Sequence, residues 1–290
     1  MTTGMFSDRF FTNSDGLRIH YRDYPAQGPA GGVPVLCLHG LTRNVKDFED
    51  LAPMIAAKGR RVIVASQRGR GRSDPDPQIE RYTPPVYAAD MLGLLDDLGI
   101  ERAVFVGTSM GGLITMMVAG LQPQRIAAAV LNDIGPSISA PGLERIQQNT
   151  SSREPAADWD EAAARTREAN LAAFPKRAGD GAFWRDFAKK TWIETADGQV
   201  ALDYDGGIIQ MIGGDAEVPD IWEYWEPFAA IPTLLVRGGI SDLLSPATVA
   251  EMKRRKPDLD FAEVPDVGHA PFMTEPEAWA KIEEFLDRVE

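Results

Sequence analysis

Residues 107–111 constrain the fold of this chain more than any other stretch. The pentapeptide GTSMG follows the apolar run 103–106 and precedes the apolar, helix-like run 112–118. A Gly-x-Ser-x-Gly turn between a strand and a helix is so sharp that its flanking positions exclude a Cβ, and the serine projects from the strand tip. The sequence therefore predicts a nucleophile elbow, with the Ser109 hydroxyl as the candidate nucleophile.

Short β-rich runs and helical patterns alternate along the rest of the chain. An antiparallel hairpin is expected from residues 10–12 and 17–24, and further strands from 33–38, 61–65, 103–106, 127–131, 233–236 and 259–264. Helical patterns lie near 47–58, 87–98, 110–121, 247–256 and 275–289. This order is typical of the α/β class. We expect a mostly parallel, eight-stranded sheet with helices on both faces.

The strand signals stop between residues 136 and 228, where Ala-rich and charged helical patterns replace them. Five of the six tryptophans lie there, namely Trp159, Trp184, Trp192, Trp222 and Trp225. Aromatic side chains supply large apolar areas for pocket walls, although they can also simply hold a small helical unit together. We predict a core domain formed by residues 1–135 and 229–290, and a helical lid inserted as residues 136–228.

Composition limits the partners and the cellular location of the chain. The formal net charge is −13, which disfavours nucleic acid and anionic membrane surfaces. The first 15 residues have no apolar core typical of a secretory signal, and no run approaches the ~20 apolar residues of a membrane helix. Cys37 is the only cysteine, so no intrachain disulfide is expected, and its apolar surroundings predict a buried core thiol. We expect a cytoplasmic monomer or small homo-oligomer that binds a small molecule and needs no metal or cofactor.

A serine nucleophile needs a base to accept its proton, and the chain has three histidines. His20 falls inside the opening hairpin, where a structural role is expected. His269 follows the last predicted strand, so it should lie at the same carboxyl edge of the sheet as Ser109. We therefore expect His269 to be the base.

The base in turn needs a carboxylate that holds it in the correct tautomer. Asp242 follows the penultimate strand in the run RGGISD and is our first choice for this acid. Asp133, which ends the strand after the elbow helix, is the alternative. With Asp242, the catalytic residues Ser109, Asp242 and His269 follow in the chain order serine, acid, histidine.

A tetrahedral intermediate requires two N–H donors aimed at its oxyanion. We expect these from the backbone of Met110, at the start of the elbow helix, and of Leu41, in the loop after the third strand. His39 should orient that loop through hydrogen bonds.

Further candidates for the substrate pocket come from this loop and from the predicted lid. Arg43, beside the oxyanion loop, could meet a substrate carboxylate, although a solvated surface arginine would look the same in the sequence. The candidates for the pocket are His39, Arg43, Asp133, Trp192 and Trp222.

Five motifs together resemble the α/β-hydrolase fold superfamily over essentially the whole chain. They are LHG at 38–40, RGRGRSD at 68–74, GTSMG at 107–111, RGGISD at 237–242 and GH at 268–269. The chain is similar to the lid-bearing carboxylesterase, lactonase and C–C hydrolase branches. Ser109 stands where the epoxide hydrolase and haloalkane dehalogenase branches use an aspartate, which separates the chain from those two.

Three functions are compatible with these features. The favoured one is a serine carboxylesterase that forms an acyl-enzyme with apolar or bulky esters, including polyester fragments. The second is a lactonase or C–C hydrolase, of the enol-lactone or ring-fission diketone type, which should also place a cation in the pocket. The third is a ligand-binding protein without catalysis, which would need the pocket but not the serine–histidine pair.

Overall fold

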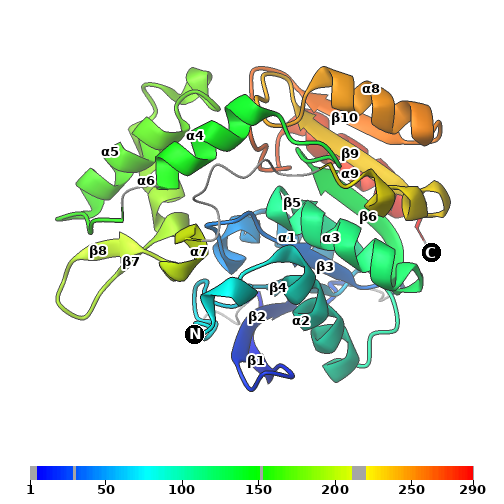
Figure 1. Cartoon of the computed structure of the whole chain (residues 1–290), viewed down its shortest axis with the longest axis horizontal. Coiled ribbons are helices and arrows are strands. Elements are labelled where there is room, and N and C mark those ends of the chain that lie inside the picture. Colours follow the sequence, from blue (N-terminus) through cyan, green and yellow to red (C-terminus); the bar gives the residue numbers. More distant parts are fainter. Residues whose placement is uncertain (1–4, 29–30, 151–152, 211–219, 290) are drawn as a thin grey trace.

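An eight-stranded sheet runs through the molecule, and its strands lie in the order β1-β2-β4-β3-β5-β6-β9-β10 (Figure 1). The computed structural model describes residues 5–28, 31–150, 153–210 and 220–289. The strands are β1 (Ser7–Thr12), β2 (Arg18–Tyr24), β3 (Val35–Leu38), β4 (Val62–Ala65), β5 (Ala103–Thr108), β6 (Ile126–Asn132), β9 (Thr233–Gly238) and β10 (Asp260–Val264). Pairing is antiparallel at β1–β2 and β2–β4 and parallel elsewhere. The predicted mostly parallel sheet is confirmed.

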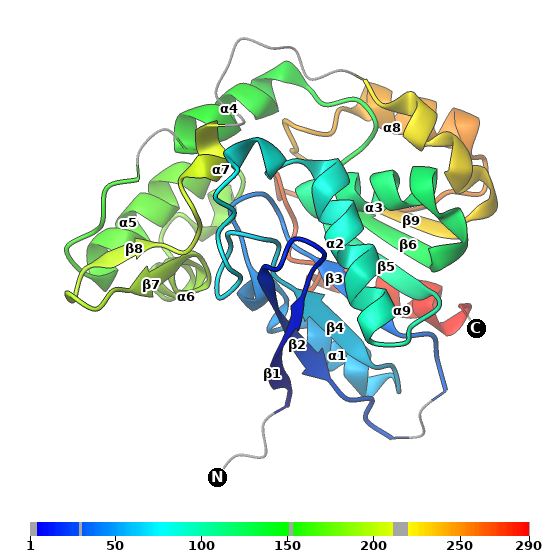
Figure 2. The ribbon, with the colours of Figure 1, turned by 60° about the horizontal axis from the view of Figure 1, so that its bottom comes forward.

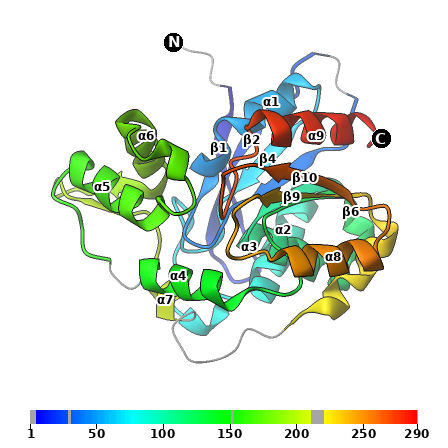
Figure 3. The same cartoon turned by 90° about the horizontal axis from the view of Figure 1, so that it is seen from above.

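Five helices cover the two faces of the sheet (Figure 3). On one face lie α1 (Leu51–Ala57) and α9 (Pro276–Asp287), and on the other α2 (Pro84–Asp97), α3 (Met110–Leu121) and α8 (Pro246–Arg255). Each helix buries an apolar side against the sheet, which produces two cores. Helices on both faces bury the parallel strands completely, so these strands consist of apolar residues in continuous runs.

Strand β3 shows this double burial residue by residue. All four of its side chains are buried. Leu36 and Leu38 belong to the core under α2 and α3, whereas Val35 and Cys37 belong to the core under α1 and α9. This alternation follows from the twofold period of a strand. The Cys37 thiol is a core group, as predicted, and burial raises its pKa.

Most of the segment between β6 and β9 lies to one side of the sheet (Figures 1 and 2). It contains α4 (Ala140–Thr150), α5 (Trp159–Asn170), α6 (Gly181–Thr191), β7 (Trp192–Glu194), β8 (Val200–Leu202) and α7 (Gly207–Gln210). The helices were expected, but the prediction that this segment contains no strands was wrong. Strands β7 and β8 pair in antiparallel register, with Trp192 opposite Leu202. Strands of three residues are too short to give a clear alternating pattern. Residues 151–152 and 211–219 of the predicted lid lie outside the described residues.

The last tryptophans of this segment pack on the sheet domain. Two short 3₁₀ helices, Trp222–Tyr224 and Glu226–Ala230, follow one another beside α3. Trp225 is buried in the core and stacks on Phe228, with ring centroids 4.9 Å apart. A Cβ at Gly120 of α3 would lie 2.6 Å from the Tyr224 ring, so the contact is close. Trp225 therefore stabilises the core.

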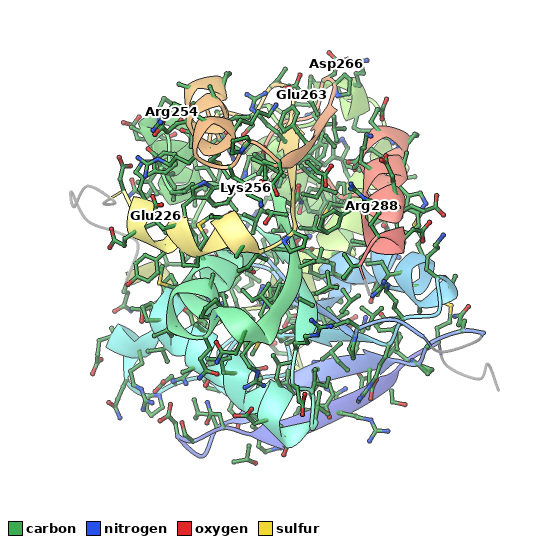
Figure 4. All side chains as sticks on the ribbon, turned by 90° about the vertical axis from the view of Figure 1, so that its right-hand side faces the viewer. Glu226, Arg254, Lys256, Glu263, Asp266 and Arg288 are labelled. Carbon is green, nitrogen blue, oxygen red and sulfur yellow. The ribbon has the colours of Figure 1, made fainter. Side chains whose placement is uncertain are left out.

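Charged side chains of both signs cover the face formed by α8, β10 and α9 (Figure 4). Arg254 pairs with Glu251, and Arg288 with Asp260, in exposed ion pairs. Such exposed pairs contribute little stability individually, because water screens the charges. Among the described residues, no helix is long and apolar enough to cross a membrane.

Candidate active site

Ser109 lies at the turn between β5 and α3, with a φ of 52°. This left-handed backbone conformation is uncommon for a residue with a side chain and marks a strained position. A Cβ at Gly107 would lie 2.5 Å from the backbone of Gly111, and one at Gly111 would lie 2.0 Å from the Leu38 carbonyl oxygen. Both glycines are thus required by close backbone approach. The predicted elbow is present in the structure.

His269 lies in the loop after β10, and its ring meets Ser109. The Nε2 atom is 2.9 Å from Ser109 Oγ, and the Nδ1 atom is 2.8 Å from Asp133 Oδ2. An ionised carboxylate can only accept a hydrogen bond, so Nδ1 carries the ring proton and donates a hydrogen bond to Asp133. Nε2 is then the acceptor for the Ser109 hydroxyl. The ring is held in the tautomer that can take a proton from the serine.

The expected pairing of His269 with Asp242 is not found, and that assignment is corrected to Asp133. Asp133 directly follows β6, the neighbour of β5 in the sheet, so its side chain emerges beside Ser109. Asp242 comes four residues after the end of β9, far enough along the loop to turn away from His269. It instead accepts two hydrogen bonds from Arg145 of α4, at 2.6 and 2.9 Å. These bonds lower the pKa of Asp242.

The Asp133 carboxylate is fully buried and accepts from two further donors. The Gly238 N–H donates to Oδ1 at 2.8 Å, and the Ser241 hydroxyl donates to Oδ2 at 2.6 Å. A buried carboxylate needs such donors, because an uncompensated charge is costly away from water. Sequence reasoning missed Ser241, although it stands next to Asp242 in a motif that was recognised.

The two expected oxyanion donors flank Ser109. Met110 is the first residue of α3, and the Gly40–Leu41 loop passes so close that a Cβ at Gly40 would lie 3.8 Å from Ser109 Cβ. Within the part of the chain that the structure describes, neither the Leu41 nor the Met110 N–H finds an acceptor. The arrangement leaves both N–H groups available for an anionic oxygen.

His39 fixes the peptide group that carries the Leu41 N–H. Its Nδ1 donates to the Gly40 carbonyl at 2.7 Å, and its Nε2 accepts from the Gln67 N–H at 3.0 Å. Burial lowers the pKa of His39 to about 4, so the ring is neutral near pH 7. From the other side, the buried Arg70 donates to the Leu41 carbonyl at 3.0 Å. His39 therefore orients the loop, as expected, but it does not line the pocket.

A cavity of about 210 Å³ adjoins Ser109 and His269. The segment between β6 and β9 supplies much of its wall, through Arg145, Ile146, Asn149, Thr150, Arg165, Thr166, Ala169, Asn170, Phe174, Phe187, Thr191, Trp192, Leu202 and Tyr204. Of the predicted pocket residues, Arg43 and Trp192 line the cavity. Asp133 lies behind His269 instead, and the placement of Trp222 in the pocket was wrong. Trp222 packs beside α3, with Arg255 4.3 Å above its ring.

Arg43 is half-buried in the cavity wall and is already paired. Its guanidinium binds Asp47, with an Nε–Oδ1 distance of 2.7 Å, donates to Thr191 and stacks 4.5 Å from the centroid of the Phe187 ring. The positive charge of Arg43 is thereby balanced by Asp47, and three of its five N–H donors are used. Arg43 is a wall residue that bridges the Gly40–Leu41 loop and α6. No cluster of potential metal ligands occurs among the described residues.

A family model described as the alpha/beta hydrolase fold matches residues 33–276 of this chain. The chain belongs to the α/β-hydrolase fold family. A 3-hydroxybutyrate-oligomer hydrolase of Cupriavidus necator is 34% identical over 278 residues, which cover 89% of this chain and 90% of that protein. An α/β hydrolase of Novosphingobium aromaticivorans has a crystal structure that matches with a TM-score of 0.91 and 41% identity, covering 99% of this chain and all of the other.

A third similar structure is more distant in sequence. The crystal structure of an E-2-(acetamidomethylene)succinate hydrolase matches this α/β hydrolase with a TM-score of 0.79 and 25% identity, covering 97% of this chain and 99% of the other. These similarities make a hydrolase of this family the established class for the chain. The type of bond that is cleaved is inferred from the chemistry of the site.

Proposed function

We propose that this α/β hydrolase is a serine carboxylic-ester hydrolase with Ser109, His269 and Asp133 as its catalytic triad. The observation that carries the proposal is the unbroken chain of hydrogen bonds from Ser109 Oγ through His269 to Asp133, at 2.9 and 2.8 Å. A protein that only binds its ligand has no need of a serine whose proton is already directed at a base. The non-catalytic alternative is therefore disfavoured.

The reaction follows from the positions of these groups. Ser109 Oγ attacks the ester carbonyl while His269 Nε2 takes its proton, and the Leu41 and Met110 N–H groups stabilise the oxyanion. The intermediate collapses to an acyl-enzyme as His269 protonates the leaving alkoxide. Water then gives a proton to His269 Nε2 and attacks the acyl carbon. The second tetrahedral intermediate collapses as His269 returns this proton to Ser109 Oγ, which releases the acid.

We propose short hydroxyalkanoate oligomers, a class of polyester fragment, as the substrates. Support comes from the Cupriavidus necator relative, whose name states that it hydrolyses 3-hydroxybutyrate oligomers. The cavity is compatible with such a chain, because aromatic walls (Phe174, Phe187) lie beside polar ones (Asn149, Thr191). An oligoester likewise alternates methyl groups with ester oxygens. The cavity volume of about 210 Å³ is compatible with a short chain of this kind.

The segment between β6 and β9 is proposed to act as the lid of this pocket. Residues of α4, α5 and α6 line the cavity that also contains Ser109, so this segment shapes the substrate site. A C–C hydrolase is less well supported, because the cations that line the cavity are already paired. Arg43 binds Asp47, Arg145 binds Asp242, and Arg165 binds Glu161. A lactone, as a cyclic ester, remains a candidate for the same machinery.

The proposal is tested by following acid release from the dimer and trimer of 3-hydroxybutyrate at constant pH, with wild type and Ser109→Ala in parallel. p-Nitrophenyl esters from acetate to decanoate and a γ-lactone complete the series. We expect turnover of the oligomers and the short esters, reduced by about 10⁴-fold or more in kcat in Ser109→Ala. Turnover that survives in Ser109→Ala would contradict the mechanism, and wild type that cleaves only the lactone would contradict the substrate class.

A further inference from the structure

We propose that Ser241 is a positioning residue, whose hydroxyl holds the Asp133 carboxylate against His269 and so sets the rate and the pH range of the reaction. This inference rests on the proposed function, because the position of Asp133 matters only if His269 acts as the base. Ser241 lies in the loop that follows β9, outside the cavity wall. It contacts neither substrate nor nucleophile and acts through Asp133.

The direction of the Ser241 proton is fixed by the backbone. Its Oγ accepts from the N–H groups of Leu243 and Leu244, both at 3.2 Å. A serine hydroxyl has two acceptor lone pairs and one proton. With both lone pairs used, the proton points to Asp133 Oδ2, 2.6 Å away. The hydroxyl is thus a preset donor rather than a free rotor.

Ser241 and His269 share the same carboxylate oxygen. Oδ2 of Asp133 receives the Ser241 hydroxyl and the His269 Nδ1–H, while Oδ1 receives only the Gly238 N–H. Ser241 is the one side chain besides His269 that donates to Asp133 among the described residues. Without it, Oδ2 is held only by the His269 ring itself, and the carboxylate is less firmly oriented against the imidazole.

The loop that carries Ser241 is held from two sides. Towards the His269 loop, the Gly239 and Ile240 N–H groups donate to the carbonyls of Val264 and Val267, at 2.8 and 3.1 Å. Towards the β6–β9 segment, the Ser139 N–H donates to the Leu243 carbonyl at 3.0 Å. A Cβ at Gly142 of α4 would lie 2.7 Å from the Leu243 Cα, so α4 packs directly on this loop. The hydroxyl therefore has a rigid support.

Among the described residues, the charged groups around this loop and the imidazole–carboxylate pair are Asp242, which acts electrostatically on His269, Arg145, which is bound to Asp242, and Arg237, which donates to the Ser241 carbonyl and pairs with Glu263. Substitutions of the Ser241 side chain leave all of them in place. The positive end of the Ser241 O–H dipole faces the Asp133 carboxylate and partly shields its charge. Removal of that dipole leaves the carboxylate better able to stabilise a protonated imidazole. The acidic limb of the kcat/KM profile, which reports loss of the neutral base, should then move to higher pH.

The test compares Ser241→Ala with wild type on the best ester found for the wild-type enzyme. We expect kcat to fall about 10- to 100-fold, the effect of losing one hydrogen bond to a charged group, with KM nearly unchanged. The acidic limb should shift upward in the same variant. The far-downfield proton resonance of the His269–Asp133 hydrogen bond should also move or broaden, and this readout needs no substrate.

Ser245→Ala is the matched control, because Ser245 lies near the other end of the same loop and its hydroxyl caps α8 by accepting from the Thr248 N–H at 3.0 Å. The Ser245→Ala variant should unfold at a slightly lower denaturant concentration and leave the pH profile and the proton resonance unchanged. Ser241→Cys retains a weak donor, should fall between wild type and Ser241→Ala, and carries the test if the alanine variant does not fold.

An unchanged profile and resonance in a folded Ser241→Ala or Ser241→Cys would overturn the inference. So would an equal shift in Ser245→Ala. Absence of ester hydrolysis by wild type would instead overturn the proposed function, so the two failures are distinguishable.

Discussion

Replacing Asp133 by asparagine separates the two possible acids of the triad most sharply. An asparagine would present an amide that can donate to His269 Nδ1, so the ring would adopt the opposite tautomer, with its proton on Nε2. That tautomer cannot accept the proton of Ser109, now 2.9 Å away. In a serine triad this change costs ~10⁴-fold in kcat, which corresponds to about 5 kcal/mol of transition-state stabilisation.

The matched variant is Asp242→Asn, which keeps the same change of charge. Asp242 holds Arg145 in a partly exposed ion pair, with side chains 36% and 21% exposed. Loss of such a pair costs about 1 kcal/mol of stability or less, and we expect kcat to fall by less than about tenfold. The substitution also removes the negative charge of Asp242, which interacts electrostatically with His269. A small shift of the acidic limb of the kcat/KM profile to lower pH is therefore expected.

The assay is the initial rate of p-nitrophenyl acetate hydrolysis over a pH series, with a thermal unfolding curve for each variant as a control for folding. The structure predicts a severe defect for Asp133→Asn and a mild one for Asp242→Asn. The reverse order, in folded proteins, would refute the assignment made from the geometry and restore Asp242 as the acid.

Three other predictions follow from the same site. His39→Ala should lower kcat by about 10²-fold with little change in KM, because the Gly40–Leu41 peptide is no longer held and one oxyanion donor is lost. A large change in KM instead would indicate a role of His39 in substrate binding. Burial lowers the pKa of His39 from 6.5 to about 4, so between these pH values the unfolded chain binds a proton that the native one does not. Through this residue, wild type should lose about 3 kcal/mol of unfolding free energy from pH 7 to pH 4. Denaturant titrations of wild type and His39→Ala over this range measure the loss, and an equal dependence of unfolding free energy on pH in both proteins would contradict it. Gly111→Ala should unfold at much lower denaturant concentration than wild type, because its Cβ would lie 2.0 Å from the Leu38 carbonyl oxygen, and a near-native midpoint would show that the elbow can relax.

The sequence was sufficient to predict the sheet and the elbow because both leave strong local signals. Buried parallel strands read as short apolar runs, and β3, β4, β5 and β6 lie where such runs were found. The elbow at Ser109 shows in the two glycines that its close backbone contacts require. The three-residue strands β7 and β8 carry too little pattern and were missed.

The acid of the triad could not be decided from sequence, because two aspartates follow neighbouring strands of the same sheet. Asp133 and Asp242 both emerge at the edge where Ser109 lies, and only the path of the loop after β9 directs Asp242 to Arg145. The positions of the Ser241 and Trp222 side chains are likewise set by how loops pack against the sheet domain. A hydroxyl that holds a carboxylate and a tryptophan that covers α3 give no periodic signal.

The central claim, that Ser109 is a nucleophile activated by His269 and Asp133, is tested most directly with diethyl p-nitrophenyl phosphate followed by intact-mass and peptide mass spectrometry. The structure predicts one diethylphosphoryl group per chain, located on Ser109, with loss of esterase activity in parallel. The modification should be much slower in Asp133→Asn and absent at this position in Ser109→Ala. A wild-type protein that stays unmodified, or one modified elsewhere while Ser109 remains free, would contradict the account.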